Sequence, residues 1–210
     1  MKTLTTAGLT LLAIVVFTAC VSVTKEKNDE AATAETCHYQ YQDKSLDFTW
    51  TAYKFTTKTG VKGTFDDIKV TTANDAKSLD DLLNSVKFTI RTGSVNSNEP
   101  QRDLKIDQFF FGTMANTKEI KGGLKEVSGN KATIAITLNE ITADLPGVIT
   151  LSGDTITLTA TVDFKAFDGA AAVKMLNQVC SEKHTGEDGK SVFWDVVDIT
   201  VKALYSKTCK

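Results

Sequence analysis

Apolar and polar side chains alternate along five stretches of the chain. A period of two places the apolar side chains on one face of a β-strand. Threonine fills most of the polar positions in these stretches, and its β-branched side chain favours extended backbone. The alternation therefore predicts strands at residues 46–52, 87–91, 131–138, 154–162 and 197–203.

Three further segments alternate less regularly and predict weaker strands at Val61–Thr72, Glu119–Val127 and Gly147–Leu151. Ser128-Gly129-Asn130 and Ser152-Gly153-Asp154 are short hairpin sequences, so neighbouring strands should run antiparallel. Eight strands with one apolar face each must bury that face, and closure of the sheet removes its exposed edges. We therefore expect an all-β protein, an eight-stranded antiparallel barrel. A two-sheet sandwich is the structural alternative.

Two stretches break the alternation and predict one or two short helices. Ser78 precedes the first of them at an N-cap position, with Asp81 three residues later. The second runs from Asp168, as its N-cap, to about His184 and ends before Gly186. Its apolar stripe consists of Val173, Leu176, Val179 and Cys180. Helices on a mostly β chain commonly cover an opening, and we expect these to do so.

Three successive phenylalanines, Phe109, Phe110 and Phe111, form the most apolar short segment of the domain. If they lie in a strand, at least one ring faces solvent and needs a cover. One interpretation is a plug of the core at an end of the barrel. The other is an apolar lip to a cavity, and the two are compatible.

The N-terminus has the form of a secretory signal, with Lys2, an apolar run from Leu9 to Phe17 and small residues before Cys20. The position of Cys20 is that of the lipid-modified cysteine of bacterial lipoproteins, although Phe17 departs from the usual leucine. The alternative is an ordinary cleaved signal. We expect residues 1–19 to be a lipoprotein-type signal peptide and residues 20–36 to be a polar tether. Export would then place the domain in the periplasm or outer envelope, attached to the membrane through lipidated Cys20.

Lipidation of Cys20 leaves three cysteines in an oxidising compartment, so we expect one disulfide. A bond between Cys37 and Cys209 would join the first strand to the last. Cys180 is the rival partner for Cys209, and the sequence leaves the pairing open.

Basic and acidic side chains nearly balance, 24 against 26, which gives a net charge of -2. Binding of nucleic acid requires a clustered basic excess, so it is excluded as a partner. With 41% hydrophobic residues the composition is globular, and it excludes disorder and a multi-span membrane protein.

The sequence offers few candidates for catalysis or metal binding. Cys180 and His184 are four residues apart, a spacing that can present two metal ligands on one helix face, and Cys37, His38 and Cys209 would have to complete the set. We favour a partly buried cysteine, a histidine at a helix end and an oxidised cysteine pair. The pairs Asp66-Asp67 and Asp80-Asp81 are interpreted as turn or surface acids. We therefore predict no catalytic residue, no metal and no cofactor.

A resemblance to the YceI-like family rests on four segments. Ser94–Asp103 leads through Leu104-Lys105-Ile106 to Phe109-Phe110 and resembles the family's Asn/Arg-Asp turn before a Phe-Phe segment. Phe48–Lys54 and Val61–Phe65 are similar to its opening hairpin, and Thr137–Thr142 to a later strand and turn. Arg102 and Asp103 are interpreted as a salt-bridged turn, with a contact to a ligand head group as the alternative.

The resemblance implies a lipocalin-like, eight-stranded antiparallel barrel over residues 37–210, as in a family whose members are exported and some of which hold a polyisoprenoid chain. The chain departs from better-known members in its lipid anchor, its extra cysteines and its helix from Asp168 to about His184. We expect the domain to bind or carry an apolar lipid, a polyisoprenoid or quinone-like chain. The alternative is a structural or partner-binding envelope lipoprotein with a packed barrel, and a hydrolase is disfavoured. The candidates for the lumen are Phe48, Trp50, Phe88, Ile90, Phe110, Ile134, Ile136, Leu138, Ile156, Leu158, Ile199 and Val201.

Overall fold

A computed structural model describes residues 35–210. The predicted signal peptide, the lipidation site Cys20 and all but the last two residues of the predicted tether lie outside the described residues. Thr36, the last tether residue, exchanges backbone hydrogen bonds of 2.9 and 3.0 Å with Lys210. The paired part of the domain therefore begins one residue earlier than expected.

Eleven strands form one antiparallel sheet in the described residues. All eight predicted segments are strands, so the all-β expectation is confirmed. The strands are β1 Cys37–Tyr41, β2 Asp47–Lys54, β3 Thr59–Phe65, β4 Ile68–Thr72, β5 Lys87–Arg91, β6 Val95–Asn96, β7 Glu119–Ser128, β8 Lys131–Leu138, β9 Ile141–Ser152, β10 Thr155–Asp163 and β11 Phe193–Cys209.

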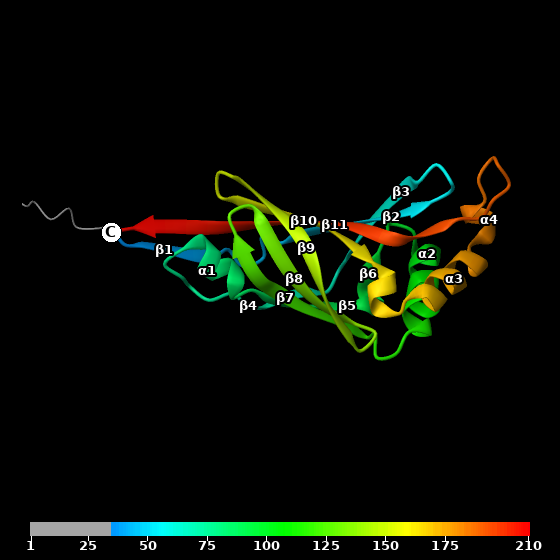
Figure 1. Ribbon diagram of the computed structural model, residues 1–210, viewed down its shortest axis with the longest axis horizontal. Helices are drawn as coiled ribbons and strands as arrows, with labels where there is room; N and C mark the ends of the chain where they lie inside the picture. The colour runs from blue at the N-terminus through cyan, green and yellow to red at the C-terminus, as the bar shows by residue number, and fades with distance from the viewer. Residues whose placement is uncertain (1–34) are drawn as a thin grey trace, which may run out of the picture. The chain divides into compact units, whose positions relative to one another are not determined.

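Short helices connect the strands. They are α1 Leu79–Asn84, η1 Thr92–Ser94, α2 Pro100–Lys105, η2 Ile106–Phe110, η3 Phe111–Thr113, η4 Phe164–Phe167, α3 Ala170–Val179 and α4 Ser181–His184. Figure 1 shows α2, α3 and α4 gathered at one end of the domain, whereas β1 and the C-terminal half of β11 run together at the opposite end. None of the helices in the described part of the chain is long and apolar enough to cross a bilayer.

The sheet follows the order β4-β5-β7-β8-β9-β10-β11-β2-β3-β6. Its two outer strands are continuations of inner ones, because β4 follows β3 after Asp66-Asp67 and β6 follows β5 after η1. The sheet therefore curls back on itself. The path corresponds to the eight predicted strands when β3 and β4 are counted as one bent strand and β5 and β6 as another. β1 is not counted, because it pairs with β11 off this path.

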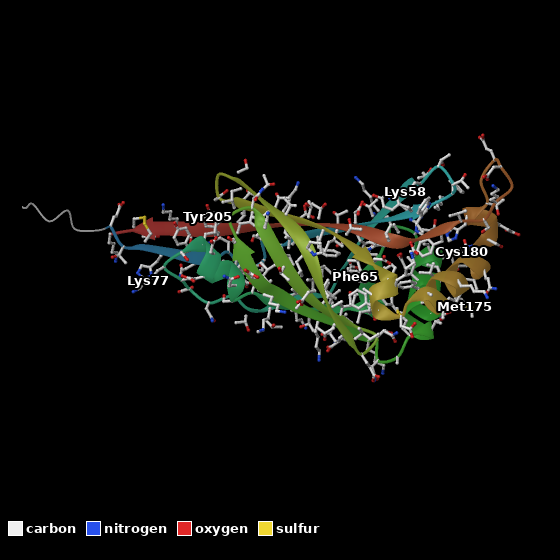
Figure 2. The ribbon with its side chains drawn as sticks, in the orientation of Figure 1. Lys58, Phe65, Lys77, Met175, Cys180 and Tyr205 are labelled. Carbon is white, nitrogen blue, oxygen red and sulfur yellow. A yellow bond between two sulfur atoms is a disulfide. The ribbon has the colours of Figure 1, made fainter. Side chains whose placement is uncertain are left out.

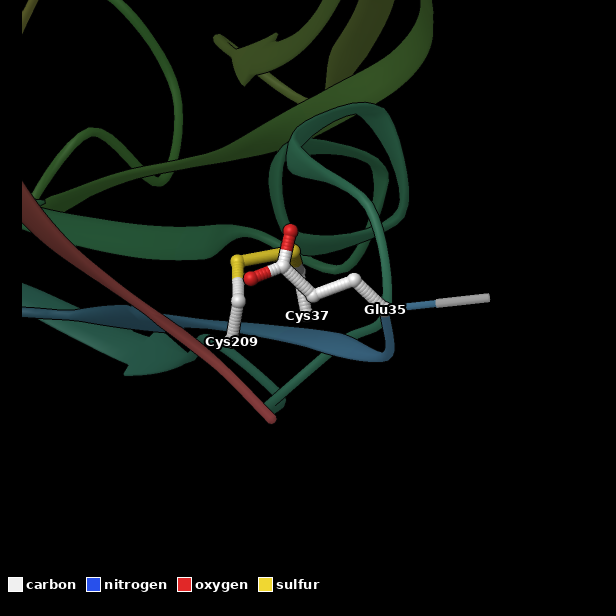
Figure 3. Close-up of side chains that lie close together, drawn as sticks. All are labelled: Glu35, Cys37 and Cys209. Atoms are coloured by element: carbon white, nitrogen blue, oxygen red, sulfur yellow. A yellow bond between two sulfur atoms is a disulfide. The ribbon is translucent and has the colours of Figure 1, made fainter. Parts of the chain in front are cut away.

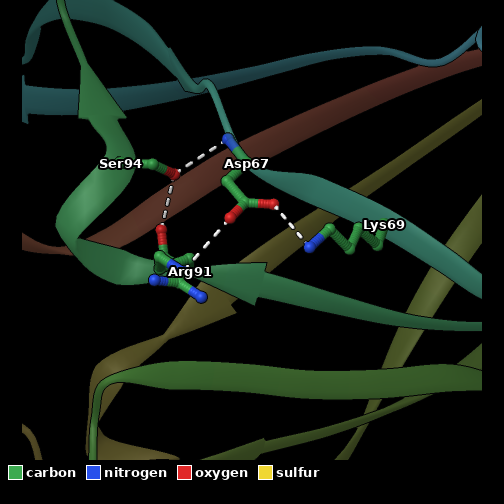
Figure 4. Close-up of polar contacts among 4 residues, drawn as sticks. All are labelled: Asp67, Lys69, Arg91 and Ser94. Atoms are coloured by element: carbon green, nitrogen blue, oxygen red, sulfur yellow. Dashed lines mark hydrogen bonds and ion pairs between the residues drawn. The ribbon is translucent and has the colours of Figure 1, made fainter.

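Polar contacts bridge the bend between β3 and β4. The backbone N–H of Asp66 donates to the carbonyl oxygen of Ser94 at 2.9 Å. The backbone N–H of Arg91 donates to the backbone carbonyl oxygen of Asp67 at 3.0 Å. The Asp67 carboxylate pairs with Arg91 at 3.1 Å and with Lys69 at 3.5 Å (Figure 4). Asp66 and Asp67 therefore hold a turn, as the sequence predicts.

The phenylalanine triplet is helical and does not lie in a strand. Pro100 begins α2, which continues through the π-helical turn η2 into η3. A helical turn can direct neighbouring side chains toward the same core, which a strand cannot. Phe110 and Phe111 are buried, and Phe110 packs edge-on against Phe164 with ring centroids 4.7 Å apart.

The second predicted helix is divided into α3 and α4, and the predicted N-cap is wrong. Asp168 has a left-handed backbone, with φ of 52°, and ends η4, whereas Gly169 precedes α3. Ala172 and Leu176 on α3 are buried, and so is Cys180 at its C-terminal end. The first predicted helix is confirmed: the Ser78 hydroxyl accepts from the backbone N–H of Asp81 at 3.1 Å.

Candidate functional site

One cavity of about 660 Å³ occupies the inside of the curled sheet. It extends between the region of Tyr205 and the region of Cys180, which Figure 2 shows toward opposite ends of the domain. In a packed barrel, side chains would meet across this space. The cavity therefore disfavours the alternative of a packed barrel without a ligand. All twelve predicted lumen residues line it: Phe48, Trp50, Phe88, Ile90, Phe110, Ile134, Ile136, Leu138, Ile156, Leu158, Ile199 and Val201.

The alternation of β8 shows why the cavity is apolar. Ala132, Ile134, Ile136 and Leu138 are buried, whereas the residues between them are less so. Cross-strand neighbours extend the same face, since Ile134 lies opposite Leu145 and Ile136 opposite Ala143. The period of two along each strand thus turns one apolar face after another toward the same space.

Two aromatic side chains of the cavity wall form hydrogen bonds within the protein. The indole N–H of Trp50 donates to the carbonyl oxygen of Thr64 at 3.0 Å, and the Tyr205 hydroxyl to that of Gly153 at 3.3 Å. Within residues 35–210 no buried side-chain nitrogen or oxygen lacks a hydrogen-bond partner. The interior of the cavity between the strands therefore offers a ligand mainly apolar contact.

The sequence missed several lining residues that lie outside the predicted strands. Leu82 and Leu83 of α1 are buried against the cavity, and Tyr41 of β1 lines it near Tyr205. An apolar pair in a six-residue helix predicts burial, which was a usable signal, but it does not tell which cavity the helix covers. Phe111 also lines the cavity, so two of the three successive phenylalanines, Phe110 and Phe111, form part of its wall.

Charged side chains line the cavity where α2 and α4 approach β2. They are Lys54, Glu99, Arg102, Lys105 and Lys183. Lys54 donates to the carbonyl oxygen of Lys183 at 3.1 Å, and Lys105 donates to that of Val179 at 3.2 Å. The helical end of the cavity is therefore basic, unlike its apolar interior.

Arg102 and Asp103 do not pair with each other among the ion pairs of residues 35–210, which corrects the predicted salt-bridged turn. Both bind Ser97 instead. The Arg102 guanidinium donates to the hydroxyl and the carbonyl oxygen of Ser97, each at 2.7 Å. The Asp103 carboxylate accepts from the backbone N–H of Ser97 at 2.9 Å and from its hydroxyl. Because both side chains have hydrogen-bonding groups directed at one serine, they fix the start of α2.

His184 and Cys180 line the same end. The His184 ring stacks on Phe193 with centroids 5.4 Å apart, and its Nδ1 lies 2.9 Å from the Asn177 side-chain oxygen. Burial and then the charges of Lys54 and Lys105 lower the pKa of His184 from 6.5 to about 4. Burial raises the pKa of the Cys180 thiol. Both side chains are therefore uncharged at neutral pH.

The disulfide lies at the opposite end of the domain. Cys37 and Cys209 face each other across β1 and β11 and are bonded, whereas Cys180 is a free, buried thiol. This selects the first of the two pairings. Glu35 lies beside the bond and completes a group of three metal-ligand residue types, the one such group in the described residues (Figure 3). Two of the three are the oxidised cysteines, which offer no thiolate.

Known proteins resemble this chain in sequence pattern and in fold. Residues 38–203 match the sequence model of the YceI-like domain. Among solved structures, the chain is similar to a polyisoprenoid-binding domain from Saccharophagus degradans implicated in plant cell wall breakdown, with a TM-score of 0.56 and 13% identity over 80% of this chain and 97% of that one. At this identity the likeness bears on the fold alone, and it supports the lipocalin-like architecture.

Two further structures are more distant. BcnA of Burkholderia cenocepacia has a TM-score of 0.49 and 13% identity over 77% of this chain and 96% of its own. The YceI protein of Campylobacter jejuni has a TM-score of 0.42 and 16% identity over 72% of this chain and 86% of its own. No curated protein has a significantly matching sequence.

Proposed function

The chain belongs to the YceI-like family, and from this premise we propose that its domain binds an apolar lipid, a polyisoprenoid or quinone-like chain, inside the sheet. The observation that carries the proposal is the apolar cavity of about 660 Å³. Cavities for small ligands commonly measure about 300–1,000 Å³. The similar structure from Saccharophagus degradans is named as a polyisoprenoid-binding domain, which supports the same ligand class.

The physical basis is transfer of hydrocarbon out of water. Each methylene that moves against such a wall gains roughly 0.8 kcal/mol, less the cost of ordering the chain. Since the interior has no unpaired buried polar group in the described residues, selectivity comes from the length and curvature of the space. The domain acts as a carrier, without chemistry on the ligand, and the protonated Cys180 and neutral His184 are in keeping with that role.

Displacement of a neutral apolar fluorescent dye by farnesol tests the proposal. We expect the purified protein to bind the dye at one site and to release it as farnesol is added. The fluorescence of Trp50, which lines the cavity, should change in parallel. A protein that takes up neither the dye nor farnesol would contradict the proposal.

We also propose that the chain is exported and held at a membrane by lipidated Cys20, in the periplasm or outer envelope. The signal-like N-terminus supports this, and so does the disulfide, because structural disulfides persist mainly in oxidising compartments. Cys20→Ser should abolish incorporation of labelled palmitate and release the protein from membranes, whereas Cys180→Ser should do neither. Unchanged labelling and membrane attachment of Cys20→Ser would contradict the anchor.

A further inference from the structure

Three lysines form the basic rim of the cavity: Lys54 at the end of β2, Lys105 at the end of α2 and Lys183 in α4. Lys54 and Lys105 are half-buried and Lys183 is exposed. They are far apart in the sequence, and the fold brings them to one end of an apolar space. Glu99 is the one acid among the described lining residues, so this end is basic in a chain whose total charge is slightly negative.

No carboxylate forms an ion pair with a lysine of the basic rim within residues 35–210. The ion pairs found there join Lys69 and Arg91 to Asp67, Lys121 to Glu119, Lys125 to Asp144 and Lys165 to Asp195, and none involves a rim lysine. Lys54 and Lys105 instead donate to the carbonyl oxygens of Lys183 and Val179. The Lys54 ammonium also lies over the Phe55 ring, 4.4 Å from its centroid. Each ammonium has three N–H donors, and one hydrogen bond to a carbonyl oxygen leaves others for a ligand.

The charges of two rim lysines act on a side chain that lines the cavity. The charges of Lys54 and Lys105 add to burial in lowering the pKa of His184, which lines the same end. An anion placed among these groups would be stabilised where a neutral head group gains little. Ammonium groups form strong, charge-assisted hydrogen bonds with phosphate oxygens.

We propose that the basic rim binds the phosphate or diphosphate head group of an isoprenoid lipid whose tail lies in the cavity. This inference rests on the proposed function and narrows its ligand class from any apolar chain to an anionic amphiphile. The apolar interior accepts the tail, and the three lysines accept the charge at the helical end of the cavity. Arg102 is not required, because its guanidinium is engaged by Ser97.

The test compares farnesyl phosphate with farnesol, which share a tail and differ in the head group, as displacers of the neutral dye from the full-length protein. We expect farnesyl phosphate to bind about tenfold tighter or more, since hydrogen bonds to charged groups exceed neutral ones. That preference should shrink as the salt concentration rises, because salt screens exposed charges. Inorganic phosphate alone should not displace the dye.

Variants of the basic rim identify the source of the preference. The triple variant Lys54→Gln, Lys105→Gln, Lys183→Gln should bind both ligands about equally, because it lacks the charges that recognise the phosphate. The matched control, Lys62→Gln, Lys87→Gln, Lys202→Gln, removes the same charge from exposed lysines that do not line the cavity, and it should keep the preference. If the triple rim variant does not fold, Lys54→Gln and Lys105→Gln measured singly should each reduce the preference.

The outcomes separate the two proposals. Equal affinities of the wild type for farnesol and farnesyl phosphate would overturn the head-group site and leave the lipid-binding function standing. An equal loss in the rim variant and the surface control would assign the preference to total charge and overturn the site as well. Displacement of the dye by inorganic phosphate at the same concentration as farnesyl phosphate would assign the rim to the free ion. Failure of both lipids to bind would overturn both proposals.

Discussion

The indole of Trp50 lies directly over Gly63, its partner across β2 and β3. A Cβ atom at Gly63 would come within 2.2 Å of Cζ2 of the indole and 2.6 Å of the Asn96 carbonyl oxygen. The same relationship recurs between Phe88 and Gly122 on β5 and β7, where a Cβ would lie 2.5 Å from the end of the ring. Aromatic rings that cover strand glycines therefore build part of the cavity wall.

Gly63→Ala should destabilise the domain by about 1–3 kcal/mol, because the indole or the backbone of Asn96 must move to admit the methyl group. The displaced Trp50 should also change its fluorescence. Chemical denaturation followed by circular dichroism measures the first effect. Gly93→Ala is the control, since the nearest atom to its Cβ, the Asp107 carboxylate oxygen, is at an ordinary 3.6 Å. A Gly63→Ala protein as stable as the control would refute this packing.

The disulfide joins residues 172 positions apart in the sequence, and reduction should therefore destabilise the domain by about 2–5 kcal/mol. Urea unfolding with and without a reductant measures the difference. Cys180→Ser should respond to the reductant as the wild type does, whereas Cys37→Ala, Cys209→Ala should not respond. The pairing would be wrong if Cys180→Ser lost its sensitivity to reduction.

The stability of the domain should fall as the pH drops from 6.5 toward 4. The pKa of His184 is 6.5 in the unfolded chain and about 4 in the fold, so between these values the unfolded state binds the extra proton. Above pH 6.5 both states leave the imidazole neutral, and the group has no effect. Urea unfolding over a pH series should show the slope, and His184→Gln should flatten it. A wild-type slope equal to that of His184→Gln would contradict the buried, neutral imidazole.

Filling the cavity should abolish lipid binding without unfolding the sheet. Leu158 lines the cavity, and Thr159, the next residue of β10, is exposed on the outer face. We therefore expect Leu158→Trp to lose dye and farnesol binding, and Thr159→Trp to keep both. Full binding by Leu158→Trp, in a protein with the circular dichroism spectrum of the wild type, would place the ligand elsewhere.

The strands were predictable because their side chains alternate, and alternation also identified eleven residues of the cavity wall, to which the phenylalanine triplet added Phe110. It could not identify β6, which has two residues, or the C-terminal part of β11, whose alternation weakens after Ala203. The secondary structure of the phenylalanine triplet could not be predicted for a different reason, because a short apolar run has no period that distinguishes a strand from a helix. The basic rim was invisible because Lys54, Lys105 and Lys183 are unremarkable lysines until the sheet and helices bring them together.

Native mass spectrometry of the protein purified from its own host tests the central claim most directly. The account predicts a second mass beyond that of the polypeptide, from one bound apolar lipid per chain, which organic solvent extracts and which is missing from Leu158→Trp but present in Thr159→Trp. A bare polypeptide mass for the wild type, under gentle conditions that keep the domain folded, would contradict it.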